Sequence, residues 1–337
     1  MAHIIYDNFV LENKVEEMVK TQIDMNNYLT PDYSLAESAG MVKKVNVYDA
    51  TGAVEELAMG EGNTDANDIE VGFVQREYRV KTTQGRFPYY DEQEMSDPMV
   101  VEVGLQKIAA LMVNDLTDKA IAEMSKAKIQ KAVSAWNFDT FADAIALYPY
   151  ENEEGLFCLI NPAQKAAIRK ALNNNLQYVE GFARTGYIGT VCNVPIIVSK
   201  AVPEGEAYLG TSKAITCFIK KGVEMEQTRD ADKRKNTITA RKVMLVALTD
   251  ATRMIKLGAA QDTVATVASA SGTAISGAAS TGAVVEIYVN KELVGTATAA
   301  NSAYSFTAPE TLVSGDVVSV IARLSGHVDS TASKVVE

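Results

Sequence analysis

The sequence contains only two histidines, His3 and His327, and they lie near opposite ends of its 337 residues. Catalytic triads, Cys–His pairs and His-based zinc sites each need at least one well-placed histidine. The GxxxxGK[ST] and GxGxxG patterns that cradle nucleotide phosphates are also absent. These absences argue against histidine-dependent catalysis and against nucleotide phosphate cradles. The chain is therefore predicted not to be an enzyme and to hold no cofactor and no metal.

Cysteines and long apolar runs are scarce as well. The three cysteines, Cys158, Cys192 and Cys217, show no CxxC spacing. The apolar neighbours of Cys158 and Cys217 predict small buried thiols in a chain that folds in a reducing compartment. No signal peptide is recognisable at the start, and no apolar run approaches the roughly 20 residues that span a bilayer. We therefore expect folding in the cytoplasm and no membrane contact.

Basic residues are outnumbered by acidic ones, 32 to 43, which gives a net charge of −11. A surface that binds nucleic acid neutralises phosphates with clustered Lys and Arg, so this balance argues against such a surface. The content of 47% hydrophobic and 22% charged residues is typical of a folded, soluble protein. The length of 337 residues predicts two or three domains.

The strongest pattern that is present is a long amphipathic helix over residues 97–126. Asp97 suits the N-cap and Pro98 suits the first helical position. We expect the apolar stripe to pack against strands from 237–257 of the same copy, and the charged side to face solvent or a neighbouring copy. The stripe consists of Val101, Leu105, Ile108, Met112 and Leu116. The opposite side carries Glu102, Lys107, Asp115, Lys119 and Glu123.

The residues before this helix predict two segments that lack a core of their own. Residues 1–40 are an irregular amphipathic arm that needs a partner surface, and Pro31 ends any helix there. Residues 41–90 have the composition of a charged two-stranded ribbon, which is marginal alone in water and should lie on another surface. A solvated, unattached hairpin is the alternative. Four of the basic residues of this ribbon are candidate contacts: Arg76, Arg79, Lys81 and Arg86.

After the helix, the pattern changes to a small α/β unit. A strand at 156–160 leads into a helix that Asn161 and Pro162 begin, and several strand-like segments follow. The acidic cluster at 151–155 is predicted to be a solvated turn, although paired carboxylates can perform acid–base chemistry. A mixed-charge loop at 229–235 is either a solvated hairpin tip or a contact between copies. Its candidate contact residues are Arg229, Asp230, Asp232, Lys233 and Arg234.

From residue 262 onward, Ala, Ser, Thr, Gly and Val dominate and helical patterns disappear. Apolar residues alternate with polar ones over 285–289, 304–306 and 318–321, and turn residues separate these segments. This spacing predicts an all-β sandwich of about seven short strands over 262–337. The sandwich carries a net charge of −4, which leaves −7 for residues 1–261.

The order of the segments resembles that of the major capsid proteins of tailed bacteriophages, which have the Hong Kong 97-type shell fold. The likeness rests on FPYYDEQEMSDPM before the long helix, on LFCLINPAQKAAIRK, and on the stretch from GTVCNVPIIVS to VMLVALTD. It implies an α+β shell domain over residues 1–261. Its parts are the N-terminal arm 1–40, the extended loop 41–90, the peripheral domain 91–130 and 237–261 with the long helix as its spine, and 131–236 as mainly the axial domain.

The tail GAVVEIYVNKELVGTATAANSAYSFTAPETLVSGDVVSVIA resembles bacterial immunoglobulin-like modules. Phage structural proteins often display such modules on the particle exterior. The resemblance implies an immunoglobulin-like sandwich at 262–337 that decorates the particle. It does not identify a ligand, and a host surface and a carbohydrate are the candidates.

Together, the two resemblances imply a virion capsid protein that is assembled in the host cytoplasm. Copies are expected to join through hexamers and pentamers into an icosahedral shell that encloses double-stranded DNA without specific binding. A portal is a further expected partner, and decoration proteins are candidates. The ribbon begins too early to leave room for a scaffolding segment, so either a separate scaffolding protein or no scaffold is expected. Two alternatives stay open: a bacterial nanocompartment shell of the same fold, and an adhesin that acts through the sandwich.

Two deletions test how the parts are used. Deleting 262–337 is expected to leave assembly intact if the sandwich is an accessory, whereas deleting 50–80 is expected to block assembly. The candidate subunit-interface residues are Arg76, Arg79, Lys81, Arg86, Arg229, Asp230, Asp232, Lys233 and Arg234.

Overall fold

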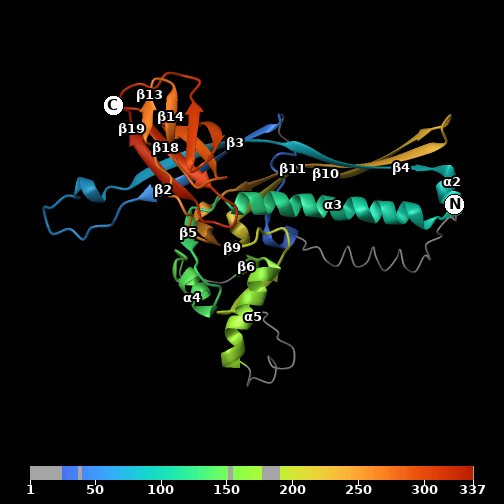
Figure 1. Ribbon diagram of the computed structural model, residues 1–337, viewed down its shortest axis with the longest axis horizontal. Coiled ribbons are helices and arrows are strands. Elements are labelled where there is room, and N and C mark those ends of the chain that lie inside the picture. The colour runs from blue at the N-terminus through green and yellow to red at the C-terminus, as the bar shows by residue number, and fades with distance from the viewer. Residues whose placement is uncertain (1–24, 37–39, 151–154, 177–189, 337) are drawn as a thin grey trace.

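The computed structural model describes residues 25–36, 40–150, 155–176 and 190–336, and Figure 1 shows four parts. A long limb built on one helix, α3, lies to one side of a compact α/β base. A β-sandwich sits on the base, and a two-stranded hairpin projects from it in the direction opposite to the limb. The mixture of helices with a majority of strands agrees with the predicted α+β class.

The limb consists of α3 (Met99–Met124) on a four-stranded sheet. The helix predicted for 97–126 is thus confirmed, and Asp97 Oδ1 accepts a hydrogen bond from the Met99 backbone N–H at 3.0 Å. A short helix that the sequence pattern did not predict, α2 (Asp91–Ser96), precedes it. The sheet has the order β1-β10-β11-β4, with β1 Thr30–Asp32, β10 Ile215–Asp230, β11 Lys235–Leu248 and β4 Lys81–Tyr90.

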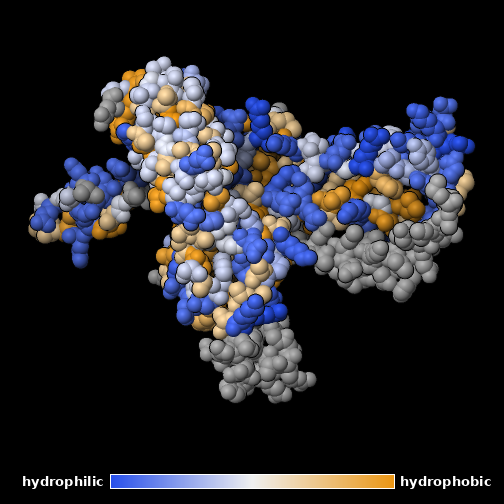
Figure 2. Space-filling model, in the orientation of Figure 1, coloured by the Kyte–Doolittle hydropathy of each residue, from blue (hydrophilic) through white to orange (hydrophobic). Residues whose placement is uncertain are grey.

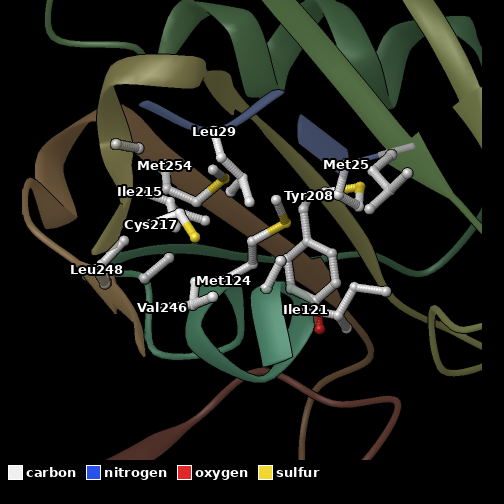
Figure 3. Close-up of a cluster of buried hydrophobic side chains, with 14 of the residues drawn as sticks. Met25, Leu29, Ile121, Met124, Tyr208, Ile215, Cys217, Val246, Leu248 and Met254 are labelled. Atoms are coloured by element: carbon white, nitrogen blue, oxygen red, sulfur yellow. The ribbon is translucent and has the colours of Figure 1, made fainter. Parts of the chain in front are cut away.

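One face of this sheet is covered by α3, which approaches it closely. A Cβ added to Gly104 of α3 would lie 2.6 Å from the ring of Phe87 in β4, so any larger residue there would require the ring to shift. Where the helix reaches the base, Met124 joins Val246 and other buried side chains in the main core (Figure 3). The packing predicted against strands from 237–257 is therefore confirmed.

The apolar stripe of α3 is less completely buried than predicted. Ile108 and Leu116 are buried, whereas Val101, Leu105 and Met112 keep part of their surface exposed. The limb has only two layers, so the stripe is fully covered only where it lies over the sheet or enters the base.

The expected orientation of the charged side is wrong in the second half of α3. Lys119 Nζ lies 2.6 Å from Asp115 Oδ2 and 2.8 Å from Thr83 Oγ1 of β4. Asp115 Oδ2 also accepts a hydrogen bond from Thr83 Oγ1 at 2.8 Å, and Glu123 is buried. These groups face the sheet because they find charged or hydroxyl partners there, which makes their partial burial tolerable.

The base is a six-stranded sheet with two helices, α4 (Phe138–Ala146) and α5 (Pro162–Leu176). As predicted, a strand at 156–160 leads into a helix, and Asn161 Oδ1 accepts a hydrogen bond from the Ala163 backbone N–H at 3.0 Å. The strand order is β5-β12-β9-β6-β8-β7, with both parallel and antiparallel pairs. The strands are β5 Ile129–Ala132, β6 Leu156–Ile160, β7 Thr190–Val191, β8 Val194–Val198, β9 Ala207–Thr211 and β12 Met254–Gly258.

The cysteines occupy structural positions. Cys158 and Cys217 are buried free thiols, as predicted, and burial raises the pKa of Cys158 to about 12. Cys192 is half-buried in the turn between β7 and β8, where it has a φ of 50°.

Residues 25–36 pack on their own chain. Met25 and Leu29 are buried in the main core (Figure 3), and β1 pairs in parallel with β10. This part of the predicted N-terminal arm finds its surface within the same copy, which differs from the expected need for a partner. The rest of that arm up to residue 24 and the acidic cluster at 151–154 lie outside the described residues.

The ribbon expected over 41–90 is divided between two sheets. The strands β2 (Val42–Thr51) and β3 (Glu70–Arg79) pair with each other over ten residues and form the projecting hairpin. The next strand, β4, pairs with β11 and belongs to the limb. The chain passes from the hairpin sheet to the limb sheet at Val80, which is buried. A short 3-10 helix, Asp65–Asn67, lies in the loop of the hairpin.

Beyond residue 262, the described regular structure consists of strands, as predicted. Seven strands form two sheets, β13-β14-β17 and β16-β15-β18-β19. The predicted segments 285–289, 304–306 and 318–321 lie in β15, β17 and β18, and Val285 is fully buried between the sheets. The strands are β13 Ser269–Ser271, β14 Ala274–Ala278, β15 Val284–Val289, β16 Glu292–Thr298, β17 Ala303–Thr307, β18 Val317–Arg323 and β19 Ser330–Val335.

Candidate interaction surfaces

The loop at the tip of the hairpin is ordered by one carboxylate. Glu55 Oε2 accepts a hydrogen bond from the Thr64 backbone N–H at 2.9 Å, and Glu55 Oε1 accepts one from the Asn67 side chain. The bond from Asn67, and then the one from Thr64, lower the pKa of Glu55. Figure 2 shows hydrophobic atoms gathered toward the outer end of this hairpin, and Val54 is 94% exposed. The tip therefore combines a defined shape with an uncovered apolar surface.

The root of the hairpin is fixed to the end of α3. The Tyr78 hydroxyl donates to Glu123 Oε2 at 2.9 Å, and Lys126 Nζ donates to Glu123 Oε1 at 2.5 Å. Lys126 Nζ also lies 5.6 Å from the centre of the Tyr78 ring, within range of a cation–π contact. Burial, followed by the charge of Glu123, raises the pKa of Tyr78. The hairpin is thus anchored at one end only.

The four basic residues predicted as ribbon contacts occupy different places. Arg76 lies in β3 beside the sandwich. Arg79 and Lys81 flank the buried Val80 and line one shallow depression beside α3. Arg86 is exposed on β4, in the limb. The structure therefore brings Arg79 and Lys81 together and separates Arg86 from them.

The loop 229–235 is a hairpin tip, one of the two roles considered for it, but it lies at the far end of the limb rather than in an axial α/β unit. The reason is that β11 pairs with β4 along all ten residues of that strand. Arg229 Nη2 lies 2.7 Å from Asp91 Oδ2, and Arg234 Nη2 lies 3.1 Å from Glu92 Oε1. The exposed turn residues are Asp230, Asp232 and Lys233.

A buried ionic cluster joins the base to the sandwich, and the sequence patterns did not identify it. Lys256, in the otherwise apolar β12, is 2% exposed. Its Nζ lies 3.0 Å from Asp329 Oδ1 and 3.7 Å from Glu206 Oε1. Tyr208 donates its hydroxyl hydrogen to Glu206, and burial, followed by the charge of Glu206, raises the pKa of Tyr208. The buried cation thus has a carboxylate partner in each part of the molecule, as burial of a charge requires.

Further bonds complete this junction. Arg323 Nη1 donates to Asp329 Oδ2 at 2.8 Å and to the Ser125 carbonyl at the end of α3 at 3.3 Å. The backbone of Ala259 bonds twice to the loop 326–328, donating at 2.9 Å and accepting at 2.8 Å. The sandwich is therefore held by charged side chains and by backbone pairing, in a fixed position on the base.

A cleft of about 690 Å³ lies between the hairpin and the sandwich. Arg76 borders it, and Nη1 of Arg76 is buried without a hydrogen-bond partner. On the sandwich side, the Tyr288 hydroxyl donates to Glu286 Oε2 at 2.9 Å. Burial, followed by the charge of Glu286, raises the pKa of Tyr288 to about 12. The cleft is thus lined by polar and charged side chains.

Within the part of the chain that the structure describes, no three His, Cys, Asp or Glu side chains are grouped to hold a metal ion. None of the described helices is both long enough and apolar enough to cross a bilayer. The features that the structure does provide are contact surfaces: the hairpin tip, the limb end and the cleft.

Comparison with known families finds one match. The model of a family described as phage capsid protein matches residues 74–257, from within β3 to within β12. The sandwich lies outside this match. No curated protein sequence matches the chain.

Solved structures share the fold. A chain from Mycobacterium phage Che8 has a TM-score of 0.55 at 16% identity, over 70% of this chain and 90% of that one. The capsid of a native GTA particle gives a TM-score of 0.54 at 11% identity, over 69% of this chain and 89% of that one. The capsid of cyanophage P-SCSP1u gives 0.52 at 12% identity, over 71% and 89%. At these identities the likeness concerns the fold.

Proposed function

The chain belongs to the phage capsid protein family, whose model matches more than half of it, and from this premise we propose how it is used. Copies of the chain join through hexamers and pentamers into the icosahedral shell that encloses double-stranded phage DNA. A multimeric capsid shell in the virion follows from the family itself. Assembly through hexamers and pentamers is supported by the hairpin, which projects from the body and exposes apolar side chains.

The proposal includes the Hong Kong 97-type shell fold. In it, α3 is the spine helix, the limb is the core of the peripheral domain, the base is the axial domain, and β2 with β3 forms the extended loop. The sequence resemblance and the similarity to solved capsid chains support this assignment.

Burial is the physical argument for assembly. A two-stranded hairpin is marginal in water by itself, and this one leaves Val54 and Ile69 largely exposed. Covering such side chains with a neighbouring copy removes apolar surface from water, which is favourable. Each contact is small, but contacts repeated around a shell add up through multivalency. Arg79, Lys81 and the limb end at 229–235 are the further contact points in this proposal.

The same proposal covers the contents and the other partners of the shell. A net charge of −11 suits a wall that encloses DNA without binding it specifically. A portal, separate scaffolding or decoration proteins, and assembly in the host cytoplasm belong to the proposal as well. The chain has a structural role in it and no catalytic one.

The sandwich is proposed to be an immunoglobulin-like module on the outside of the shell that binds a host surface or carbohydrate. Its seven strands in two sheets support the assignment, as does its position outside the matched capsid region. An adhesin role for the whole chain is the alternative function from another class.

Electron microscopy of the purified full-length chain tests the proposal. Negative stain should show shells, tubes or capsomers, and a chain that stays a monodisperse monomer at high concentration contradicts it. The contents of any shells distinguish a phage capsid from a bacterial nanocompartment. Nuclease-protected DNA in particles from infected cells supports the phage capsid, whereas a protein cargo supports the nanocompartment alternative.

A further inference from the structure

The cleft between the hairpin and the sandwich is basic in a chain that is acidic overall. Five basic and three acidic residues line it, a net of two positive charges, whereas the whole chain carries −11. Two of the five cations are already paired, Lys126 with Glu123 and Arg323 with Asp329. The other three are Lys44, Arg76 and Lys291.

These three cations have no carboxylate of the described residues within ion-pair distance. Lys44 and Lys291 are exposed at the rim. Arg76 already interacts with Tyr78 through its side chain, but its Nη1 is buried and makes no hydrogen bond. When a guanidinium N–H is buried without a hydrogen-bond acceptor, the protein loses the full free energy of desolvating that group. An oxygen atom placed beside Arg76 would remove that penalty. The cleft is therefore suited to an anionic ligand.

The hairpin tip of this same chain is an anionic segment that could act as such a ligand. Residues 45–75, which include the hairpin tip, contain seven acidic residues and no Lys or Arg. The tip is ordered by Glu55 and exposes Val54, Met59 and Ile69. It projects away from the rest of its own copy (Figure 1), so the cleft that it could reach belongs to another copy.

We propose that the cleft binds the acidic hairpin tip of a second copy. Carboxylates of the tip accept charge-assisted hydrogen bonds from Arg76 and pair with Lys44 and Lys291, while the exposed apolar side chains of the tip are covered. This inference rests on the proposed self-assembly and specifies the contact surface on the receiving copy. It also gives the sandwich a part in assembly, because Lys291 and half of the cleft belong to it.

A peptide experiment tests the binding directly. A synthetic peptide of residues 50–70 is titrated into the full-length chain and followed by fluorescence anisotropy. We expect saturable binding that weakens with added salt, because screened charges attract less. The double variant Arg76→Gln/Lys291→Gln should weaken binding about tenfold or more, in line with the loss of charge-assisted hydrogen bonds.

The matched control is Lys170→Gln/Lys200→Gln, which removes the same charge from two exposed positions outside the cleft. It should bind the peptide like the original chain. Equal binding by the two double variants overturns the proposal. Tighter binding of a sulfated oligosaccharide than of the peptide, lost in the cleft variant, also overturns it, because the cleft is then a glycan site.

Electron microscopy separates this inference from the proposed function. If the cleft variant is folded by circular dichroism and forms no shells while the control forms them, the inference is supported. If the cleft variant forms shells as well as the control does, the inference is wrong and the shell function stands. If no variant and no original chain ever forms shells, the proposed function itself has failed.

Discussion

Lys256 is a cation that the fold encloses almost completely, between carboxylates of the base and the sandwich. Removing one partner from a buried ionic group leaves the others without compensation, and this typically costs more than the group contributed. The same reasoning applies to Glu206, which receives hydrogen bonds from Tyr208 and from a backbone N–H of the sandwich. A single substitution at Lys256 or Glu206 therefore tests how much the whole junction contributes to the stability of the fold.

The substitution Lys256→Met should lower the free energy of unfolding by about 3 kcal/mol, because Glu206 stays buried without its cation. Adding Glu206→Gln should recover part of the loss, since the amide carries no charge. Urea denaturation of the unassembled chain measures both effects. The exposed control, Lys200→Met, should stay within about 0.5 kcal/mol of the original. A loss at Lys256 no larger than at Lys200 would show that the ionic cluster does not stabilise the fold.

Glu55 gives the hairpin tip a dependence on pH. Its folded pKa lies below the ordinary value of 4.5 because of hydrogen bonds from Asn67 and Thr64. The stabilisation is therefore fully present above the ordinary value and is lost as the pH falls through the lowered pKa. Hydrogen exchange followed by mass spectrometry should show faster exchange at Thr64 at acidic pH, after correction for the intrinsic rate. Glu55→Gln should show that faster exchange already at pH 7, whereas the exposed Glu56→Gln should not.

At the scale of elements, the contact between α3 and β4 depends on Gly104. A Cβ there would lie 2.6 Å from the ring of Phe87. Alanine favours helix by about 1 kcal/mol over glycine, but forcing a methyl group into a packed interface costs about 1–3 kcal/mol. We expect Gly104→Ala to lower the melting temperature measured by circular dichroism. Gly222→Ala, where a Cβ meets nothing within 4 Å, is the control. A Gly104→Ala chain as stable as the control would mean that the ring moves aside freely.

The elements differ in how far the sequence could predict them. The signals for α3 are local: Asp97 at its start and apolar residues at helical spacing, so both its existence and its length could be predicted. The placement of β4 could not, because its partner β11 lies about 150 residues away in the sequence. The burial of Asp115 and Lys119 was missed for the same reason, since Thr83 of β4 supplies part of their environment.

The candidate sites also differ in whether their signals are local in the sequence or depend on distant residues. The charged tip at 229–235 is a local feature, and its hairpin form was among the sequence predictions. The junction was missed because Lys256 and Asp329 are 73 residues apart. The only local signal was a lysine within the apolar run MIKLG, and its partners depend on how the sandwich docks. The cleft depends on the same docking.

At the scale of the whole molecule, the junction alters what a deletion of 262–337 should do. Removing the sandwich takes Asp329 away from Lys256 and Arg323 away from the end of α3, and it opens the end of β12 to solvent. We now expect the truncated chain to have a lower melting temperature and to form few shells. Normal stability and normal shells, measured by scanning calorimetry and microscopy, would restore the view of the sandwich as an accessory.

A shorter deletion provides the contrast. Replacing the tip loop 52–69 with Asn-Gly, which suits a two-residue hairpin turn, leaves the Tyr78–Glu123 anchor in place. The melting temperature should stay close to that of the original chain, because nearly all the described side chains of this loop are exposed, while shells should be absent from the micrographs. Shells in normal numbers would show that the tip is dispensable.

The fixed attachment of the sandwich also decides how mechanical force travels through the molecule. The chain leaves β12 at Gly258, and Ala259 is already bonded to the sandwich loop 326–328. Within the base, β12 is held on both sides, by β5 and by β9. A pull on the sandwich therefore loads β12 along its length, so the hydrogen bonds of two ladders share the load in shear instead of opening one by one. In the proposed particle, tension on an exterior sandwich therefore passes straight into the shell wall, with no slack tether to absorb it.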